Sequence, residues 1–220
     1  MSIVKEDFRL AILDAALAHI PFDGWTLTAL EAGAVDAGYP KIDAVRAFPD
    51  GPAEAAQFHS EVADKNMVAA FIEMETMPLR TKEKVAALVR LRLEGVVEQK
   101  EAVRLGFGLL SRPQNATRGL RALAKTADEI WKAVGDRSSD FNWYTKRGLV
   151  AAVYVSTVSY WLNDTSEGSR ETWAFLDRRL DDAMRFPKKA AEFFDKLRNN
   201  VPRSDGIFAA LKQRRMARRW

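Results

Sequence analysis

Few side chains in this sequence could carry out covalent or metal chemistry. The chain has no cysteine and only two histidines, His19 and His59, which excludes disulfides, thiolate nucleophiles and Cys/His zinc sites. Neither histidine stands at the Glu-x-x-His spacing that a di-iron centre in a helical bundle needs, and His19 is expected to cap the end of the first helix. We therefore predict no catalytic residue, no metal site, no cofactor and no enzymatic activity.

One short stretch, "GDRSSDFNWYTKRGLVAAVY" at residues 135–154, has an unusual mixture of side chains at a helix start. Trp143 and Tyr144 stand beside Lys146 and Arg147. Trp, Tyr and Arg are enriched at the centres of protein interfaces, because they offer large area and directional hydrogen bonds. The stretch therefore indicates either a partner-binding surface or a helix start that folds back onto its own domain.

A second stretch, "RLGFGLLSRP", contains the spacing Gly106-Phe107-Gly108. A glycine-rich phosphate loop of this kind follows a strand, and no strand pattern precedes it here. The spacing therefore predicts a mobile helix end.

Apolar residues recur at helical spacing along almost the entire chain, which predicts an all-α fold of about nine to ten helices. Expected helices span residues 4–19, 27–37, 41–48, 53–75, 81–99, 116–135, 141–162 and 171–184. The two short helices joined at Gly38 form a helix-turn-helix-like unit. Its expected packing residues are Leu30, Val35, Ile42 and Val45. We expect this unit at 1–50, a helical bundle at 51–202 and a basic helix at 203–220.

The second short helix offers little for reading DNA. It carries only Lys41 and Arg46 as cations, whereas sequence readout needs several donors together with cations for phosphates. Four acidic residues lie nearby: Glu31, Asp36, Asp43 and Asp50. We therefore expect no nucleic-acid partner for this unit.

The basic character of the chain is concentrated in its tail. Ten basic and three acidic residues follow Pro187, a net charge of +7; the whole chain carries +4, so residues 1–186 carry −3. The candidate membrane-binding residues of the tail are Ile207, Phe208, Leu211, Arg214, Arg215 and Arg218. A solvated charged tail remains the alternative, because Arg214 and Arg218 continue the apolar side. With no run of about 18 apolar residues and no signal peptide, we expect an intracellular protein, at most peripheral to a membrane.

The run DFNWYTKR within residues 135–154, together with "ETWAFLDRRLDDAM" at 171–184, resembles the COQ-nine-type ubiquinone biosynthesis protein family. The resemblance covers most of the chain and is strongest over 126–184. It implies a fold like that of TetR-family regulators, a homodimer, no enzymatic activity and a cavity for isoprenoid lipid. It also implies an accessory role, in which the protein presents a quinone precursor to the demethoxyubiquinone hydroxylase.

Site residues follow from this resemblance. The family's partner-binding patch lands on Asp140, Trp143, Tyr144, Lys146 and Arg147, and its membrane-binding last helix lands on the tail. Helices that are apolar on more than one face could line a lipid cavity or form an ordinary core. The lipid-binding candidates that they supply are Leu88, Leu91, Leu120, Leu123, Val150 and Tyr154.

The resemblance also predicts assembly and location. The dimer is expected to form through helices 141–162 and 171–184, with a rim of Arg178, Arg179, Asp181 and Asp182. In a bacterium the protein would lie in the cytoplasm, peripheral to the inner membrane; in a eukaryote it would lie on the matrix side of the mitochondrial membrane. The alternative function is a TetR-type ligand-responsive transcriptional regulator.

Overall fold

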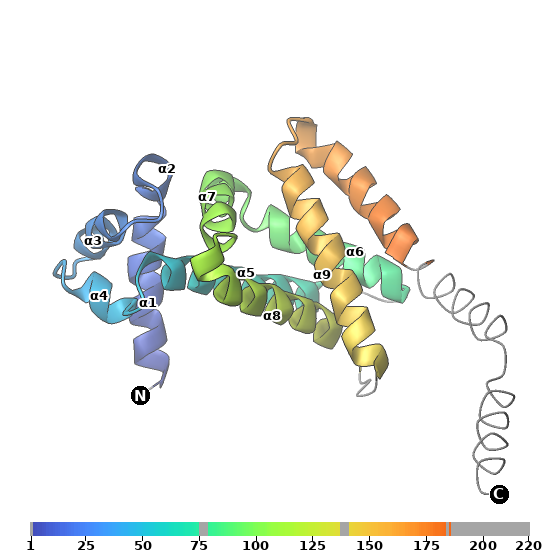
Figure 1. The fold of residues 1–220 in the computed structure, drawn as a ribbon, viewed down its shortest axis with the longest axis horizontal. Coiled ribbons are helices and arrows are strands. Elements are labelled where there is room, and N and C mark those ends of the chain that lie inside the picture. The colour runs from blue at the N-terminus through green and yellow to red at the C-terminus, as the bar shows by residue number, and fades with distance from the viewer. Residues whose placement is uncertain (1, 75–78, 137–140, 184, 186–220) are drawn as a thin grey trace, which may run out of the picture. The chain divides into compact units, whose positions relative to one another are not determined.

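The structure is a computed structural model that describes all residues except 1, 75–78, 137–140, 184 and 186–220. Every regular element among the described residues is a helix (Figure 1). The α-helices are α1 (Ser2–Ala16), α2 (Ile20–Asp23), α3 (Leu27–Asp36), α4 (Asp43–Ala47), α5 (Pro52–Glu73), α6 (Thr81–Glu94), α7 (Lys100–Leu110), α8 (Ala116–Val134) and α9 (Phe141–Trp161). Short 3₁₀ turns occupy Val97–Gln99, Pro113–Asn115 and Glu167–Ser169, and residues 170–183 are also helical. The prediction of an all-α fold is confirmed.

The chain divides into two compact units, residues 1–180 and 181–220. In the second unit the described residues are 181–183 and 185, so the predicted basic helix at 203–220 lies outside the described residues. The predicted domain boundaries at residues 50 and 202 stay predictions.

The first four helices form the helix-turn-helix-like unit, and small residues bring them close together. A Cβ on Gly33 of α3 would lie 2.5 Å from the backbone nitrogen of Ala16 in α1, so α3 fits against α1 only because residue 33 has no side chain. Three further alanines of the unit, Ala29, Ala34 and Ala44, are fully buried. At this crossing, the absence of a side chain on Gly33 therefore sets the spacing of α1 and α3.

This packing corrects the expected core of the unit. Leu30 is buried as predicted, but Val35, Ile42 and Val45 are exposed at 50%, 56% and 40%. Prediction of these three as packing residues is wrong, because the inner faces of α3 and α4 are formed instead by Leu30 and by buried alanines such as Ala34 and Ala44.

The predicted role of His19 also changes. Helix α1 ends at Ala16, and the His19 ring lies 2.6 Å from the Asp36 carboxylate of α3, measured from Nε2 to Oδ2. His19 thus does not cap the end of α1: it is the N-cap residue of α2, and its side chain links this position to the end of α3.

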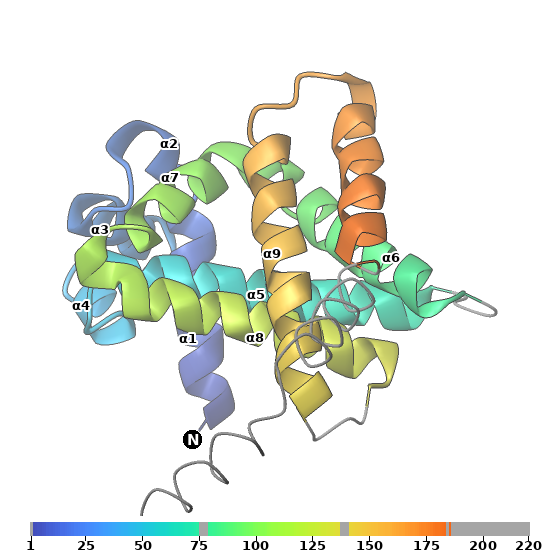
Figure 2. The same ribbon diagram turned by 45° about the vertical axis from the view of Figure 1, so that its right-hand side comes forward.

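The larger bundle is built around α5, which packs against α6, α7 and α8. Figure 2 shows α5 and α8 side by side, with α9 crossing α8. Two turn residues with positive φ bound these helices: Gly51 precedes α5 with φ +76°, and Gly135 ends α8 with φ +90°. Glycine adopts this left-handed backbone at no steric cost.

Helix α7 was not expected from the sequence. Gly106, Phe107 and Gly108 lie within its second half, near its end at Leu110; that this helix end is mobile stays a prediction. The Trp25 indole packs directly against α7. Its Nε1 donates to the carbonyl of Ala102 at 2.9 Å, and a Cβ on Gly106 would lie 3.2 Å from the same nitrogen, so residue 106 has little room for a side chain. Packing against Trp25 therefore holds α7 helical despite its two glycines.

None of the helices in the described part of the chain is long and apolar enough to cross a membrane.

The contact between Gly33 and Ala16 gives a first prediction. We expect Gly33→Ala to lower the free energy of unfolding by about 1 to 3 kcal/mol, because the new methyl group must displace the backbone of α1. Gly108→Ala is the matched control: its Cβ would meet nothing within 4 Å, so it should raise stability by about 0.5 to 1 kcal/mol. Urea unfolding of both variants measures the difference, and equal stability would contradict the proposed close packing.

Candidate cavity site

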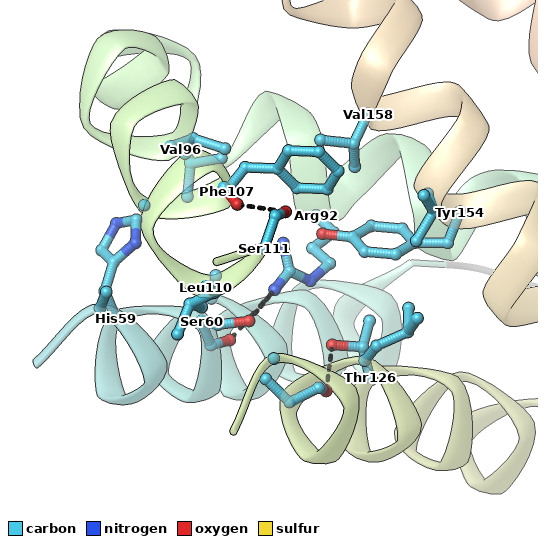
Figure 3. A pocket seen from close by; sticks show the side chains of 18 of the residues that line it. His59, Ser60, Arg92, Val96, Phe107, Leu110, Ser111, Thr126, Tyr154 and Val158 are labelled. Carbon is cyan, nitrogen blue, oxygen red and sulfur yellow. Dashed lines mark hydrogen bonds between the residues drawn. The ribbon is translucent and has the colours of Figure 1, made fainter. Parts of the chain in front are cut away.

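A cavity of about 380 Å³ lies inside the bundle and is lined by residues from α5, α6, α7, α8 and α9 (Figure 3). Most of the lining is apolar. The apolar lining residues are Ala56, Ala63, Val96, Ala102, Val103, Gly106, Phe107, Leu110, Ala116, Gly119, Leu120, Ala122, Leu123, Val155 and Val158. The volume falls at the small end of the roughly 300 to 1,000 Å³ typical of ligand pockets.

The cavity opens to solvent where α7 ends and α8 begins. Phe107 on α7 and Leu120 on α8 both line it, and they are 36% and 66% exposed. The junction is tight, since a Cβ on Gly119 would lie 2.6 Å from the carbonyl oxygen of Leu110. Exposed apolar side chains at such an opening are suited to the passage of an apolar ligand.

One side of the cavity is polar and centres on a buried ion pair. Arg92 on α6 donates from Nε to Oδ1 of Asp64 on α5 at 2.7 Å, and their side chains are only 4% and 2% exposed. Arg92 Nη2 donates to Ser60, at 2.7 Å to Oγ and 3.2 Å to the carbonyl oxygen. Thr126 on α8 donates to Asp64 at 3.0 Å. The pair thus joins α5, α6 and α8 at a single point.

Tyr154 of α9 completes this polar side. Its ring lies over the Arg92 guanidinium, with Cζ 4.9 Å from the ring centroid, and Figure 3 shows the Tyr154 and Arg92 side chains reaching toward each other from facing helices. Neither Arg92 Nη1 nor the Tyr154 hydroxyl forms a hydrogen bond to a described residue. Two donors are therefore available beside the apolar lining.

Burial shifts the titration of these groups. Burial raises the pKa of the Tyr154 hydroxyl, so it stays protonated and can donate. Burial lowers the pKa of His59, which lines the cavity and hydrogen-bonds Gln99 at 2.7 Å, so its ring is neutral at neutral pH. Burial also raises the pKa of Asp64, opposed by Arg92 and Thr126. Because Arg92 cannot lose its proton, a guanidinium at 2.7 Å favours the carboxylate form of Asp64.

The predicted lipid-binding residues fall into two groups. Leu120, Leu123 and Tyr154 line the cavity. Leu88 and Val150 are buried and Leu91 is half-buried, but none of these three is among the lining residues. The spacing of apolar residues pointed to α6, α8 and α9, which all contribute to the cavity, but it did not point to α5 or α7 and could not tell a cavity-facing side chain from a core side chain.

Sequence reasoning missed the polar side of the cavity, although a signal was present. Val85, Val89 and Arg92 follow each other at helical spacing, as do Asp64, Met67 and Phe71, and all six are buried. A charge that continues an apolar helix face is a candidate for burial, and two such charges of opposite sign on neighbouring helices indicate a buried pair.

The predicted partner-binding residues are described only in part. Asp140 lies outside the described residues, and Trp143 and Tyr144 lie in α9 with side chains that are not described. Lys146 forms an ion pair with Asp136 at 2.8 Å. Arg147 is 11% exposed and donates from Nε to Asp128 of α8 at 2.7 Å. The two cations therefore connect the first half of α9 to α8, through Asp128, and to the turn that follows α8, through Asp136.

These ion pairs change the titration of Asp128. Burial alone would raise the pKa of Asp128, but hydrogen bonds from Lys132 and Arg147 outweigh it and lower the pKa.

The remaining predicted residues belong to the tail and to the dimer rim. The candidate membrane-binding residues Ile207 to Arg218 are outside the described residues. Of the predicted dimer rim, Arg178, Asp181 and Asp182 are exposed and Arg179 is half-buried. Within the described residues there is no group of three or more His, Asp or Glu side chains that could hold a metal ion.

Comparison with known proteins connects this architecture to one family. Residues 116–187 match the sequence model of the COQ9 family. The chain is 34% identical over 180 residues to the mitochondrial ubiquinone biosynthesis protein COQ9 of Drosophila melanogaster, covering 80% of this chain and 55% of the relative. It is 31% identical over 186 residues to human COQ9, covering 82% and 58%, and 30% identical over 188 residues to COQ9-B of Xenopus laevis, covering 82% and 64%. The resemblance to the COQ9 family is confirmed, and the chain spans between 55% and 64% of the length of these relatives.

The fold has a solved counterpart. A TetR transcriptional regulator from Nitrosomonas europaea ATCC 19718 matches with a TM-score of 0.64 at 20% identity, over 80% of this chain and 97% of that one. The predicted TetR-like fold is confirmed.

The contacts of Arg147 give a second prediction. Arg147→Ala should lower the free energy of unfolding by about 1 to 3 kcal/mol, because it removes a largely buried partner of Asp128. Lys132→Ala is the control: Lys132 binds the same carboxylate at 2.8 Å but is 58% exposed, so its loss should change stability by less than about 1 kcal/mol. Thermal unfolding of both variants tests this prediction. Wild-type stability of the Arg147→Ala protein would contradict it.

Proposed function

We propose that this protein is a non-catalytic accessory protein of ubiquinone biosynthesis that holds a polyprenyl quinone intermediate in its cavity and presents it to a demethoxyubiquinone hydroxylase. One observation carries the proposal: a largely apolar cavity with exposed apolar residues at its opening lies in a chain similar to COQ9 proteins. A long isoprenoid chain exceeds about 380 Å³, so the head group and first isoprene units would occupy the cavity and the rest would leave through the opening.

Presentation of a lipid also requires surfaces for a membrane, for the hydroxylase and for a second copy of the chain. The basic tail with its net charge of +7 supplies cations for an anionic lipid surface, each contributing on the order of 1 kcal/mol near that surface. A homodimer through α9 and the helical residues 170–183 is part of the same proposal. The setting would be the inner membrane of a bacterium or the matrix side of the mitochondrial one.

The regulator alternative fits the described surface less well. Arg46, one of two cations on the second short helix, is paired with Asp43 at 2.7 Å, and Val35, Ile42 and Val45 expose apolar area where donors for DNA would be needed. A fold shared with a regulator does not carry its function.

Filling the cavity provides the test of lipid binding. Leu123 lines the cavity from α8, so Leu123→Trp places a large ring into the lipid space and should lower the amount of co-purifying isoprenoid lipid at least about fivefold. Ala124, the exposed neighbour, supplies the control Ala124→Trp, which should leave lipid content unchanged. Lipid extraction and mass spectrometry of the purified proteins measure both. A wild-type protein with no isoprenoid lipid would count against the proposal.

The partner proposal is tested at Trp143. If this aromatic faces the hydroxylase, Trp143→Ala should change the free energy of unfolding by less than about 1 kcal/mol, yet weaken hydroxylase binding by about 2 kcal/mol or more. Tyr144→Ala should behave alike. Melting curves together with a pull-down on the hydroxylase of the same organism decide the matter, since a loss of about 3 to 5 kcal/mol in stability would assign these aromatics to the core.

A further inference from the structure

We propose that the polar side of the cavity selects an uncharged, oxygen-bearing head group, such as a quinone or phenol, and rejects carboxylates and phosphates. This inference rests on the proposed function, since it concerns the ligand of the same cavity. It assigns the head-group contacts to Arg92 and Tyr154, and the charge selectivity to Asp64.

The proposed head-group contacts use the donors of Arg92 and Tyr154 that form no hydrogen bond within the described part of the protein. Arg92 commits Nε to Asp64 and Nη2 to Ser60, which leaves Nη1 with no hydrogen bond to a described residue. The Tyr154 hydroxyl likewise forms no hydrogen bond to a described residue, and both residues line the cavity. An unmade hydrogen bond in a largely apolar site is costly, so these two donors favour a ligand that brings an acceptor. An oxygen of the ligand head group supplies that acceptor.

The charge selectivity follows from the pairing of Arg92. Its guanidinium is the one cation among the residues that line the described cavity, and the Asp64 carboxylate balances it at 2.7 Å. His59 adds no charge, because burial lowers its pKa. The polar side is therefore close to neutral. An anionic head group would lose its hydration and stand near Asp64 without a cation of its own, whereas a carbonyl or phenol oxygen needs only the two donors.

The structure also indicates why selection is needed. A cavity lined mainly by alanine, valine and leucine would accept the tail of any membrane lipid or fatty acid with little discrimination. Buried polar groups discriminate much more strongly, because a ligand that fails to match them leaves them unpaired. The polar side thus gives the cavity a preference that its apolar lining cannot.

The test compares two amphiphiles with similar tails, a decyl-substituted benzoquinone and dodecanoate, binding to the delipidated full-length protein by calorimetry. We expect the quinone to bind at least about tenfold tighter. Tyr154→Phe should weaken the quinone about fivefold by removing one donor. Tyr160→Phe is the matched control on the same helix: its hydroxyl bonds Glu171 at 3.3 Å and does not line the cavity, so binding should not change.

A second variant reads out the charge directly. Asp64→Asn removes the balancing carboxylate, so dodecanoate should now bind tighter than the quinone and raise the melting temperature more. If this variant does not fold, the preference of the wild-type protein for quinone over dodecanoate and the effect of Tyr154→Phe still test the proposal.

The outcomes separate this inference from the proposed function. Equal or tighter binding of dodecanoate by the wild-type protein, or quinone binding unaffected by Tyr154→Phe, would overturn the head-group assignment while leaving lipid binding intact. Binding of neither amphiphile would overturn both.

Discussion

The ion pair between Asp64 and Arg92 is the interaction on which the bundle and its cavity depend. Removing two charges from water is strongly unfavourable unless each is paired and hydrogen-bonded. Here the pair draws α5 and α6 together, Thr126 adds α8 through a hydrogen bond to Asp64, and the ring of Tyr154 on α9 covers the guanidinium. Aliphatic side chains packed over the remaining donors would leave them unsatisfied. A cavity at this point is therefore consistent with the charges below it, since a polar ligand atom can satisfy donors that a hydrocarbon core cannot.

Much of the fold follows from local sequence signals, and the exceptions have physical causes. Helical periodicity predicted both ends of α5 to within two residues, and Gly135 marked the end of α8. Helix α7 was not predicted because Gly106 and Gly108 lower its intrinsic helix propensity. The hydrogen bond from Trp25 to Ala102, residues that are 77 positions apart in the sequence, stabilises the helix in the fold. In the helix-turn-helix-like unit, periodicity places Val35, Ile42 and Val45 in the core, yet these side chains are exposed, while Ala29, Ala34 and Ala44 of the same helices are buried. Both errors arise from tertiary contacts that no local window contains.

The cavity shows a similar division. Apolar helix faces pointed to Leu120, Leu123 and Tyr154, but volume left unfilled between helices is a property of their three-dimensional arrangement and cannot be read from periodicity. The charged residues were missed for a different reason: an isolated Asp or Arg within a helix is ordinarily solvated, and only the position of each on an otherwise apolar face distinguishes Asp64 and Arg92. For Lys146 and Arg147, composition suggested a surface patch, and the structure adds intramolecular ion pairs to Asp136 and Asp128.

The distribution of charge bears on how a TetR-like fold can serve a purpose other than DNA binding. Residues 1–186 carry a net charge of −3 and the remainder carries +7, so the positive charge that would attract a polyanion or an anionic lipid surface stands, along the sequence, outside the segment that forms the helix-turn-helix-like unit. On that unit Arg46 is paired with Asp43, and exposed Val35, Ile42 and Val45 present no donors to phosphate. Phosphate contacts supply essentially all of the non-specific affinity of a protein for DNA, and in this sequence the positive net charge stands in residues 187–220 rather than in the segment that forms the helix-turn-helix-like unit.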